Sequence, residues 1–248
     1  TAAAARSAAP HVIRRGVVFE VINTSEGSLG CPADRRTYRI HGTLVGPRRA
    51  VTGDDGGRLV NVLVHDSGTG GWFWSMPGTG YDYAGSLAAK GQLSLVLDRL
   101  GYGASRLGNG RSTCLGAQTV MLHEIVQRLY AGNYTFTNGA QIAAPHALHV
   151  VLHGHGVGAA IAQREAADFG DVDGLVLMSW SDTSTSSADD AETNRQVGAC
   201  RGSATYTTLG ATAADFRRLL FADAPARVVR SEEHTSELQS PMYLVCRL

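Results

Sequence analysis

The chain has 248 residues, 44% of them hydrophobic and 18% charged, a composition that fits one globular α/β domain with a sizeable core. Its 22 basic and 22 acidic residues balance, so its net charge gives no reason to expect binding to nucleic acid or to an anionic membrane surface. The longest apolar runs have the length of strands, far short of the ~20 residues that a membrane span requires. We therefore expect neither a nucleic-acid partner nor a membrane span.

Strand and helix patterns alternate along the chain. Apolar runs and alternating apolar residues predict strands over 17–22, 37–45, 59–65, 93–98, 148–153 and 172–180. Helical spacing predicts helices over 82–90, 114–130 and 157–169. Strands separated by helices of this length form βαβ units. The sequence therefore predicts an α/β fold with a mostly parallel, doubly wound sheet in which the 172–180 strand is buried.

The composition becomes polar after residue 181, and two further helices are predicted over 188–197 and 211–221. We divide the chain into four parts by these changes. They are an N-terminal extension with the first strand (1–30), an α/β core (31–182), a helical insertion (183–229) and a tail (230–248).

The tail resembles the translation of a common sequencing-library adapter, which gives residues 230–240 in this order. The chain also begins at Thr1 rather than at an initiator methionine. We therefore expect residues 1–229 to be an internal fragment of a longer protein and 230–248 to be an artefact that takes no part in the fold.

A glycine-rich corner follows the 148–153 strand and precedes the 157–169 helix. Its sequence is Gly154-His155-Gly156-Val157-Gly158. A strand, a sharp turn and a helix in this order form the setting of the hydrolase nucleophile elbow, G-x-S-x-G, in which the turn exposes a serine oxygen. Here the serine position holds Gly156, which has no side chain and cannot attack a carbonyl.

The same corner satisfies a second motif. Residues 154–159 match the dinucleotide-binding pattern G-x-G-x-x-G/A, in which the glycine at the position of Gly156 lets the backbone approach a pyrophosphate. That pattern belongs on the first strand of its unit, with an acidic residue at the end of the next strand. Here several strands precede it, Asp171 and Asp173 come before the next strand, and Asp182 comes too late. Dinucleotide binding stays the less favoured alternative, and we expect no cofactor and no metal site.

Three segments together resemble the α/β-hydrolase family, in its secreted, esterase- or lipase-like form with an added cap. Residues 62–74 are similar to the strand and loop that supply one oxyanion donor. Residues 95–105 are similar to the family's Asp-x-x-Gly-x-Gly-x-Ser segment, and 153–180 to the elbow and the next strand. The resemblance extends from about residue 31 to residue 221. It implies acyl transfer on ester-type substrates and makes the 183–229 insertion a cap over the active site.

The resemblance assigns roles to individual residues. Val157 and Ser67 would supply the two backbone N–H donors of the oxyanion hole, and Asp66 stands where the family usually has glycine. Asp182 lies at one of the places that relatives use for the triad acid, although capping of the Ser/Thr-rich loop explains it equally well. No histidine before residue 229 fits the general base, so the catalytic histidine is expected beyond that point.

His65, Trp72 and His155 are expected to line the pocket, where the aromatic run 72–74 would suit an apolar ligand; filling of the core is the competing explanation for that run. We expect a small-molecule ester or acyl ligand and, with Gly156 in place of serine, an inactive chain. Two explanations of Gly156 stay open. One is a single-base change from serine, and the other is a pseudoenzyme that binds without cleaving.

Cysteines outside the tail are Cys31, Cys114 and Cys200. An odd number, together with the small residues at the N-terminus, favours an exported protein with one disulfide and a thiol whose partner has been lost. The competing explanation is three reduced cysteines in a cytosolic protein. The pairing cannot be deduced from the sequence.

Overall fold

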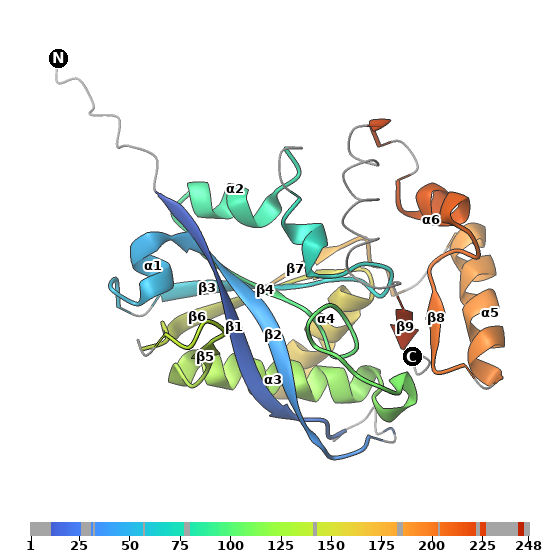
Figure 1. Cartoon of the computed structure of the whole chain (residues 1–248), viewed down its shortest axis with the longest axis horizontal. Coiled ribbons are helices and arrows are strands. Elements are labelled where there is room, and N and C mark those ends of the chain that lie inside the picture. The colour runs from blue at the N-terminus through green and yellow to red at the C-terminus, as the bar shows by residue number, and fades with distance from the viewer. Residues whose placement is uncertain are drawn as a thin grey trace.

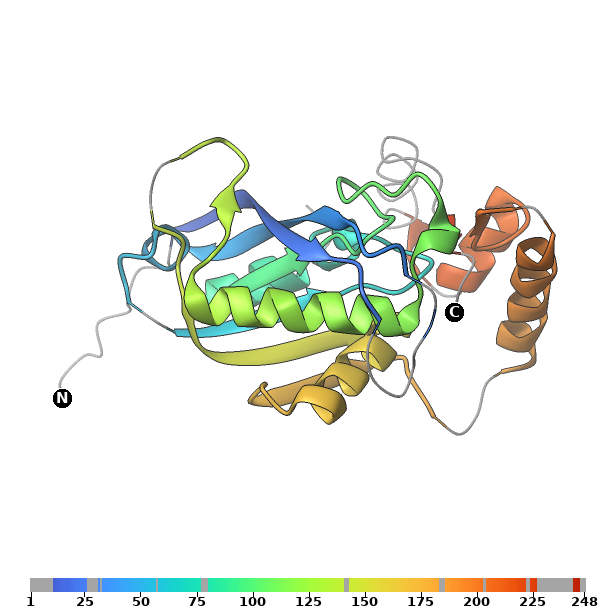
Figure 2. The ribbon, with the colours of Figure 1, turned by 90° about the horizontal axis from the view of Figure 1, so that it is seen from below.

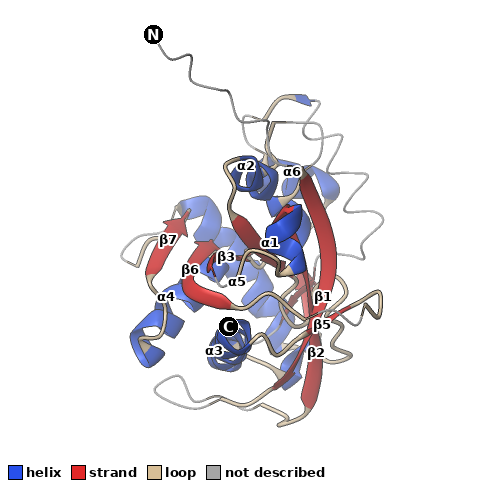
Figure 3. Ribbon diagram, turned by 90° about the vertical axis from the view of Figure 1, so that its left-hand side faces the viewer, coloured by secondary structure: helices blue, strands red, loops and turns tan. Residues whose placement is uncertain are grey.

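The computed structural model describes residues 11–25, 31, 33–56, 58–76, 80–140, 143–182, 186–202, 204–221, 224–226 and 243–245. A seven-stranded sheet forms the centre of the described structure, with helices on both of its faces (Figures 1 and 3). Its strands are β1 (Val12–Ile22), β2 (Thr37–Pro47), β3 (Arg58–Val64), β4 (Leu93–Leu97), β5 (Thr135–Phe136), β6 (Ala147–His155) and β7 (Gly174–Met178). Their order across the sheet is β5-β1-β2-β4-β3-β6-β7.

The sheet is parallel in one half and antiparallel in the other. β4, β3, β6 and β7 run parallel to one another, as the sequence predicts. β1 pairs antiparallel with β2 along its whole length, and β2 pairs antiparallel with β4. β1 and β2 are consecutive strands with no described helix between them, and strands joined without a crossover pair antiparallel. The predicted α/β fold is confirmed, in the form of a mixed sheet.

Helices cover the sheet unequally. α3 (Leu115–Ala131) and α4 (Val157–Phe169) lie side by side on one face, and α2 (Tyr83–Ala89) lies on the other (Figures 1 and 2). α1 (Arg48–Thr52) is a short helix between β2 and β3. α4 has the predicted bounds. α3 begins one residue later than predicted, because Cys114 is its N-cap and accepts a hydrogen bond from the Ala117 N–H at 3.4 Å. None of the described helices has both the length and the apolarity needed to cross a bilayer.

β7 forms one edge of the sheet, and its prediction as a buried strand is wrong. Its side chains alternate between half-buried and exposed, with Leu175 39% and Leu177 41% exposed. β7 pairs only with β6 among the described strands, so its other edge has no partner strand in the described structure.

The segment predicted as a helical insertion lies beyond one end of the sheet (Figures 1 and 2). It contains α5 (Ser187–Arg201), β8 (Tyr206–Thr208) and α6 (Ala213–Leu220). Arg111, in the chain between β4 and α3, donates from Nε to the Ala204 carbonyl at 2.9 Å, and the Tyr206 hydroxyl donates to the Leu107 carbonyl. Leu209 packs on Gly68, after β3. The segment therefore contacts the loops that follow the carboxyl ends of β3 and β4.

Part of the tail that we expected to lie outside the fold is described. Tyr243–Val245 forms β9, which pairs antiparallel with β8. The rest of 230–248 lies outside the described residues, as do residues 1–10.

A disulfide joins Cys31 to Cys114, with their Cα atoms 6.4 Å apart. It links the connection between β1 and β2 to the first residue before α3. No described cysteine is a free thiol, in contrast to the expectation of one unpaired sulfur.

Because this bond closes a loop with a sequence separation of 83 residues, its removal should release much chain entropy in the unfolded state. We expect Cys31→Ser to lower the free energy of unfolding by roughly 3–5 kcal/mol and the Tm by about 10 °C, measured by chemical and thermal denaturation. Cys114→Ser and the double variant are the controls. The free energy of unfolding should fall by the same amount in all three variants. A fall in the double variant equal to the sum of the two single falls would show that the two sulfurs act separately.

Candidate active site

The turn between β6 and α4 has a backbone conformation that favours glycine. β6 ends at His155, α4 begins at Val157, and Gly156 between them has φ 53° and ψ −124°. A residue with a Cβ atom is strained in this conformation, and glycine adopts it freely. The Gly156 N–H donates to the Met178 carbonyl at 3.0 Å, which ties the turn to β7. The strand, sharp turn and helix that an elbow requires are all present.

Helix α4 starts in backbone contact with the end of β3. A Cβ atom on Gly158 would lie 2.2 Å from the Val64 carbonyl oxygen and 2.6 Å from the His65 carbonyl oxygen, so only glycine fits. This approach places the first N–H groups of α4 beside the loop that follows β3.

The side chain of Asp66 occupies the position of the missing nucleophile. Its Oδ1 accepts a hydrogen bond from the Val157 N–H at 2.7 Å, and the Ser67 hydroxyl lies 3.4 Å from the same oxygen. A Cβ atom on Gly156 would lie 2.3 Å from Asp66 Oδ1. The N–H expected to stabilise a substrate oxyanion therefore binds the protein's own carboxylate. Ser67, the other expected donor, contacts that carboxylate through its hydroxyl.

His65 is fully buried and has both ring nitrogens engaged. Nε2 accepts from the Arg99 N–H at 3.1 Å, so Nδ1 carries the proton and donates to the Asp66 carbonyl at 2.7 Å. Burial, reinforced by the nearby Arg99 charge, holds the pKa of His65 well below its usual range. A neutral ring with two backbone partners fixes the loop that carries Asp66. It is not free to move protons or to contact a ligand.

His153 and His155 point to different surroundings on β6. His153 lies between the Tyr83 hydroxyl and Asn61 Oδ1, each 3.0 Å from one ring nitrogen, and burial lowers its pKa to about 4. His155 stacks on Phe73 with ring centroids 4.3 Å apart. Burial lowers the pKa of His155, and the Asp66 charge partly opposes that shift. Both rings are therefore neutral near pH 7 and act as packing groups.

Trp72 lines a cleft of about 590 Å³, which lies along β1, β2 and β4. The cleft also contains Asp98, which accepts from the Gly71 N–H at 3.2 Å and the Ala104 N–H at 3.1 Å. Burial raises the pKa of Asp98, and these two N–H donors partly counter the shift. His65 and His155 are not among the residues that line this cleft, although the Phe73 ring lies between Trp72 and His155, with ring centroids 6.4 Å and 4.3 Å away. Sequence analysis did not assign Asp98 to a pocket.

Asp182 lies on the surface after β7. It accepts from Gln163 Nε2 at 3.0 Å and from Trp180 Nε1 at 2.7 Å, and these two hydrogen bonds lower its pKa. Its described partners are thus an amide and an indole rather than a histidine. The expected catalytic histidine falls beyond residue 229, and His234 lies outside the described residues.

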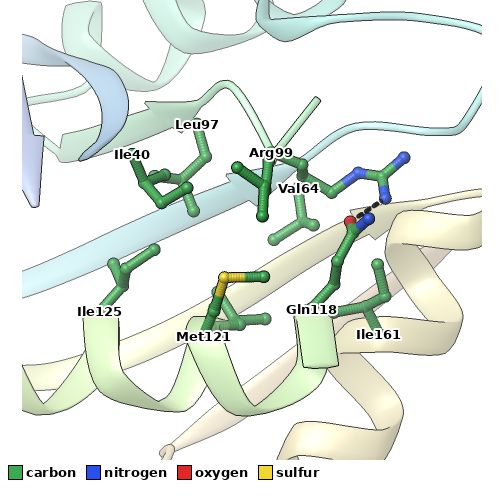
Figure 4. Close-up of a pocket in the computed structure, with 10 residues that line it drawn as sticks. Ile40, Val64, Leu97, Arg99, Gln118, Met121, Ile125 and Ile161 are labelled. Atoms are coloured by element: carbon green, nitrogen blue, oxygen red, sulfur yellow. Dashed lines mark hydrogen bonds between the residues drawn. The ribbon is translucent and has the colours of Figure 1, made fainter. Parts of the chain in front are cut away.

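A buried arginine was also missed by sequence analysis. Arg99 is 7% exposed and reaches toward α3, where Nη1 donates to Gln118 Oε1 at 2.5 Å (Figure 4). Its guanidinium lies 4.6 Å from the Tyr102 ring centroid. Nε and Nη2 have no hydrogen-bond partner among the described residues. The space beside it, shown in Figure 4, measures only about 20 Å³ and is lined mostly by aliphatic side chains, so it is a packing gap rather than a ligand site.

Comparison with protein families identifies the scaffold. A model described as the alpha/beta hydrolase family matches residues 62–245. The chain belongs to this family. Comparison with curated proteins gave no match.

Solved structures show the same fold at low sequence identity. Rv0554 from Mycobacterium tuberculosis is 16% identical with a TM-score of 0.53, over 90% of this chain and 68% of that one. The peroxisomal alpha-beta-hydrolase Lpx1 from Saccharomyces cerevisiae is 12% identical with a TM-score of 0.51, over 96% and 65%. The bottromycin epimerase BotH is 20% identical with a TM-score of 0.51, over 86% and 66%. Across eight similar structures, the chain spans 43% to 68% of the other chain's length.

The contact between Asp66 and Gly156 predicts a coupled pair of substitutions. Gly156→Ser should lower the free energy of unfolding by roughly 1–3 kcal/mol, because the new Cβ is strained and meets the Asp66 carboxylate. In an Asp66→Ala background, the same change should cost about 1 kcal/mol less, as measured by a double-mutant cycle in urea. Equal costs in both backgrounds would contradict the contact, and a Tm raised by several degrees would contradict a turn conformation that favours glycine.

The lowered pKa of His153 predicts a pH dependence of stability. As the pH falls from about 6.5 to about 4, the unfolded chain takes up a proton on this ring before the folded chain does, so stability falls across that window. His153→Gln, which can keep both hydrogen bonds, should remove roughly 1–2 kcal/mol of this acid-induced loss. The measurement is urea denaturation of both proteins at pH 7 and pH 4.5. Parallel losses in the two proteins would contradict the assignment.

Proposed function

We propose that this chain derives from an α/β-hydrolase that acts on ester-type substrates, and that it does not carry out serine-based acyl transfer with Gly156 in the elbow. The observation that carries the proposal is the Asp66 carboxylate, which accepts the Val157 N–H at 2.7 Å and takes the space of the nucleophile. Membership of the family supports a hydrolase ancestry. The ester substrate and the loss of turnover are our inference.

Two requirements of the reaction are unmet at this turn. Acyl transfer needs a nucleophile that attacks the carbonyl carbon, and Gly156 offers none. It also needs N–H donors free to hold the negative oxygen that develops on the substrate, and loss of one such donor typically costs ~10²–10³ in rate. Here a substrate oxygen would compete for the Val157 N–H with a carboxylate, a strong hydrogen-bond acceptor that repels a developing negative charge.

Binding without turnover is the second candidate function. The cleft of about 590 Å³ beside Trp72 has the volume of a small-molecule site, and its lining combines aromatic, aliphatic, acidic and basic side chains. One structural neighbour is named as an epimerase rather than a hydrolase, in keeping with the many chemistries that one scaffold supports. A small acyl or ester ligand would suit this cleft.

Dinucleotide binding is disfavoured by the same carboxylate. In that mode the helix N-terminus after the glycine turn holds a pyrophosphate. In this chain the N-terminus of α4 already accommodates the negative charge of Asp66, which would repel a phosphate group.

The proposal predicts no ester hydrolysis by the chain as written. Initial rates with p-nitrophenyl acetate and butyrate should equal those of the heat-denatured protein. Gly156→Ser should stay inactive, because the carboxylate still competes for the Val157 N–H. The matched variant is Gly156→Ser with Asp66→Gly, which frees that N–H and restores the glycine typical of the family at position 66.

Each result distinguishes between the possible functions of the site. Turnover by the chain as written that disappears in Asp66→Asn would overturn the proposal and make Asp66 a reacting group. Labelling of the double variant by a fluorophosphonate, which reacts with activated serines, would show that a base in this chain can activate a serine at position 156, and would support a hydrolase ancestry. A saturable change in tryptophan fluorescence on titration with ethyl butyrate, absent in Trp72→Leu, would support binding without turnover.

A further inference from the structure

Three potential metal ligands meet on the helical face of the sheet, away from the turn between β6 and α4. His123 lies on α3, Glu165 on α4, and Asp171 in the loop between α4 and β7. α3 and α4 lie side by side there (Figure 2). Glu165 follows Val157 by more than two helical turns, roughly 12 Å along α4, so this cluster is separate from the site of Asp66.

The spacing of the three side chains suits a common ion. His123 Nδ1 lies 2.9 Å from Asp171 Oδ2 and 3.7 Å from Glu165 Oε1. One ligand atom from each residue lies within 4.8 Å of the other two. Ligand atoms held ~2.0–2.2 Å from a tetrahedral zinc ion are about 3.3 Å apart, a value that falls between the two measured separations.

Burial leaves several nitrogen and oxygen atoms of this cluster without a hydrogen bond. The Glu165 side chain is 0% exposed, and neither of its oxygens has a hydrogen-bond partner among the described residues. His123 Nδ1 and Asp171 Oδ1 are likewise buried without a hydrogen bond in the described structure. A buried carboxylate without a partner is costly, and a cation between these groups would remove that cost.

Neighbouring groups hold two of the ligands in place. The ring of Phe169 stacks on His123 with centroids 3.8 Å apart. Gln127 donates to Asp171 Oδ2, and the Tyr130 hydroxyl donates to the Asp171 carbonyl at 2.8 Å. Outer contacts that orient a ligand in this way are typical of metal sites.

We propose that His123, Glu165 and Asp171 bind one divalent transition-metal ion, with Zn²⁺ as the best match. One imidazole and two carboxylates form a three-ligand set that leaves a fourth position for water. The imidazole nitrogen disfavours Mg²⁺ and Ca²⁺, which prefer oxygen ligands alone. Two carboxylates and a 2+ ion also balance in charge. The site joins α3, α4 and the loop before β7.

A proton is the competing occupant. Burial, with the adjacent Asp171 carboxylate, raises the pKa of Glu165 to about 9, so the carboxyl group can be neutralised by protonation instead. A metal and a proton make different predictions, because only the metal needs all three residues together and only the metal gives a measurable stoichiometry.

The test is metal titration of the full chain after treatment with a chelator. Isothermal titration with ZnCl₂ should give one ion per chain, and Zn²⁺ at a hundred times its Kd should raise the Tm by roughly 5–10 °C. Co²⁺ should give the visible absorption of a four-coordinate site, a readout that does not depend on stability. Glu165→Gln and His123→Gln should each weaken binding at least tenfold and abolish that absorption.

The matched control is His149→Asn. His149 forms an exposed pair with Asp173, with Nδ1 2.7 Å from Oδ1, so it offers the same atoms without the third ligand and without burial. This variant should bind Zn²⁺ like the parent. If Glu165→Gln does not fold, His123→Gln alone decides, because that ring is partly exposed. Absence of Zn²⁺ and Co²⁺ binding by the parent, or binding unchanged in His123→Gln, would overturn the proposal.

Discussion

The contact between the first turn of α4 and the end of β3 is the constraint on which the candidate site depends. Gly158 permits it, because any side chain there would collide with the Val64 carbonyl. With the helix in this place, the Val157 N–H faces the loop after β3, and the positive end of the helix dipole favours a negative group there. Asp66 supplies that group. The turn before α4 thus forms an anion-binding position, and the Asp66 carboxylate of the same chain occupies it.

Local patterns in the sequence predict the frame of this site. The 157–169 helix has the predicted bounds because the strand, the glycine corner and the apolar spacing all act within a short stretch of chain. The contact of Asp66 with Val157 joins residues far apart in sequence, so no local pattern reveals it. The burial of β7 was mispredicted for a related reason, since an apolar run looks the same at the edge of a sheet as at its centre.

Burial determines the pKa values and hydrogen-bond partners of the histidines, and the sequence alone does not show which histidines are buried. His65 and His153 flank the predicted site in the sequence, yet each has both nitrogens engaged and a lowered pKa. His123 lies against two carboxylates. Its partners come from another helix and a loop, with no ligand spacing along the chain, so the expectation of no metal site could not anticipate the cluster.

The Asp66 carboxylate has a further consequence for any ligand that seeks the N-terminus of α4. It is an intramolecular competitor, tethered beside the Val157 N–H at a high effective concentration. When an external carbonyl or carboxylate binds the Val157 N–H, it must displace the Asp66 carboxylate. Its net gain in free energy is therefore only the difference between the two hydrogen bonds. Neutral apolar ligands that need no such donor meet no competition. The turn would therefore discriminate by polarity, with weak affinity for the oxygen-rich groups that an open oxyanion hole attracts.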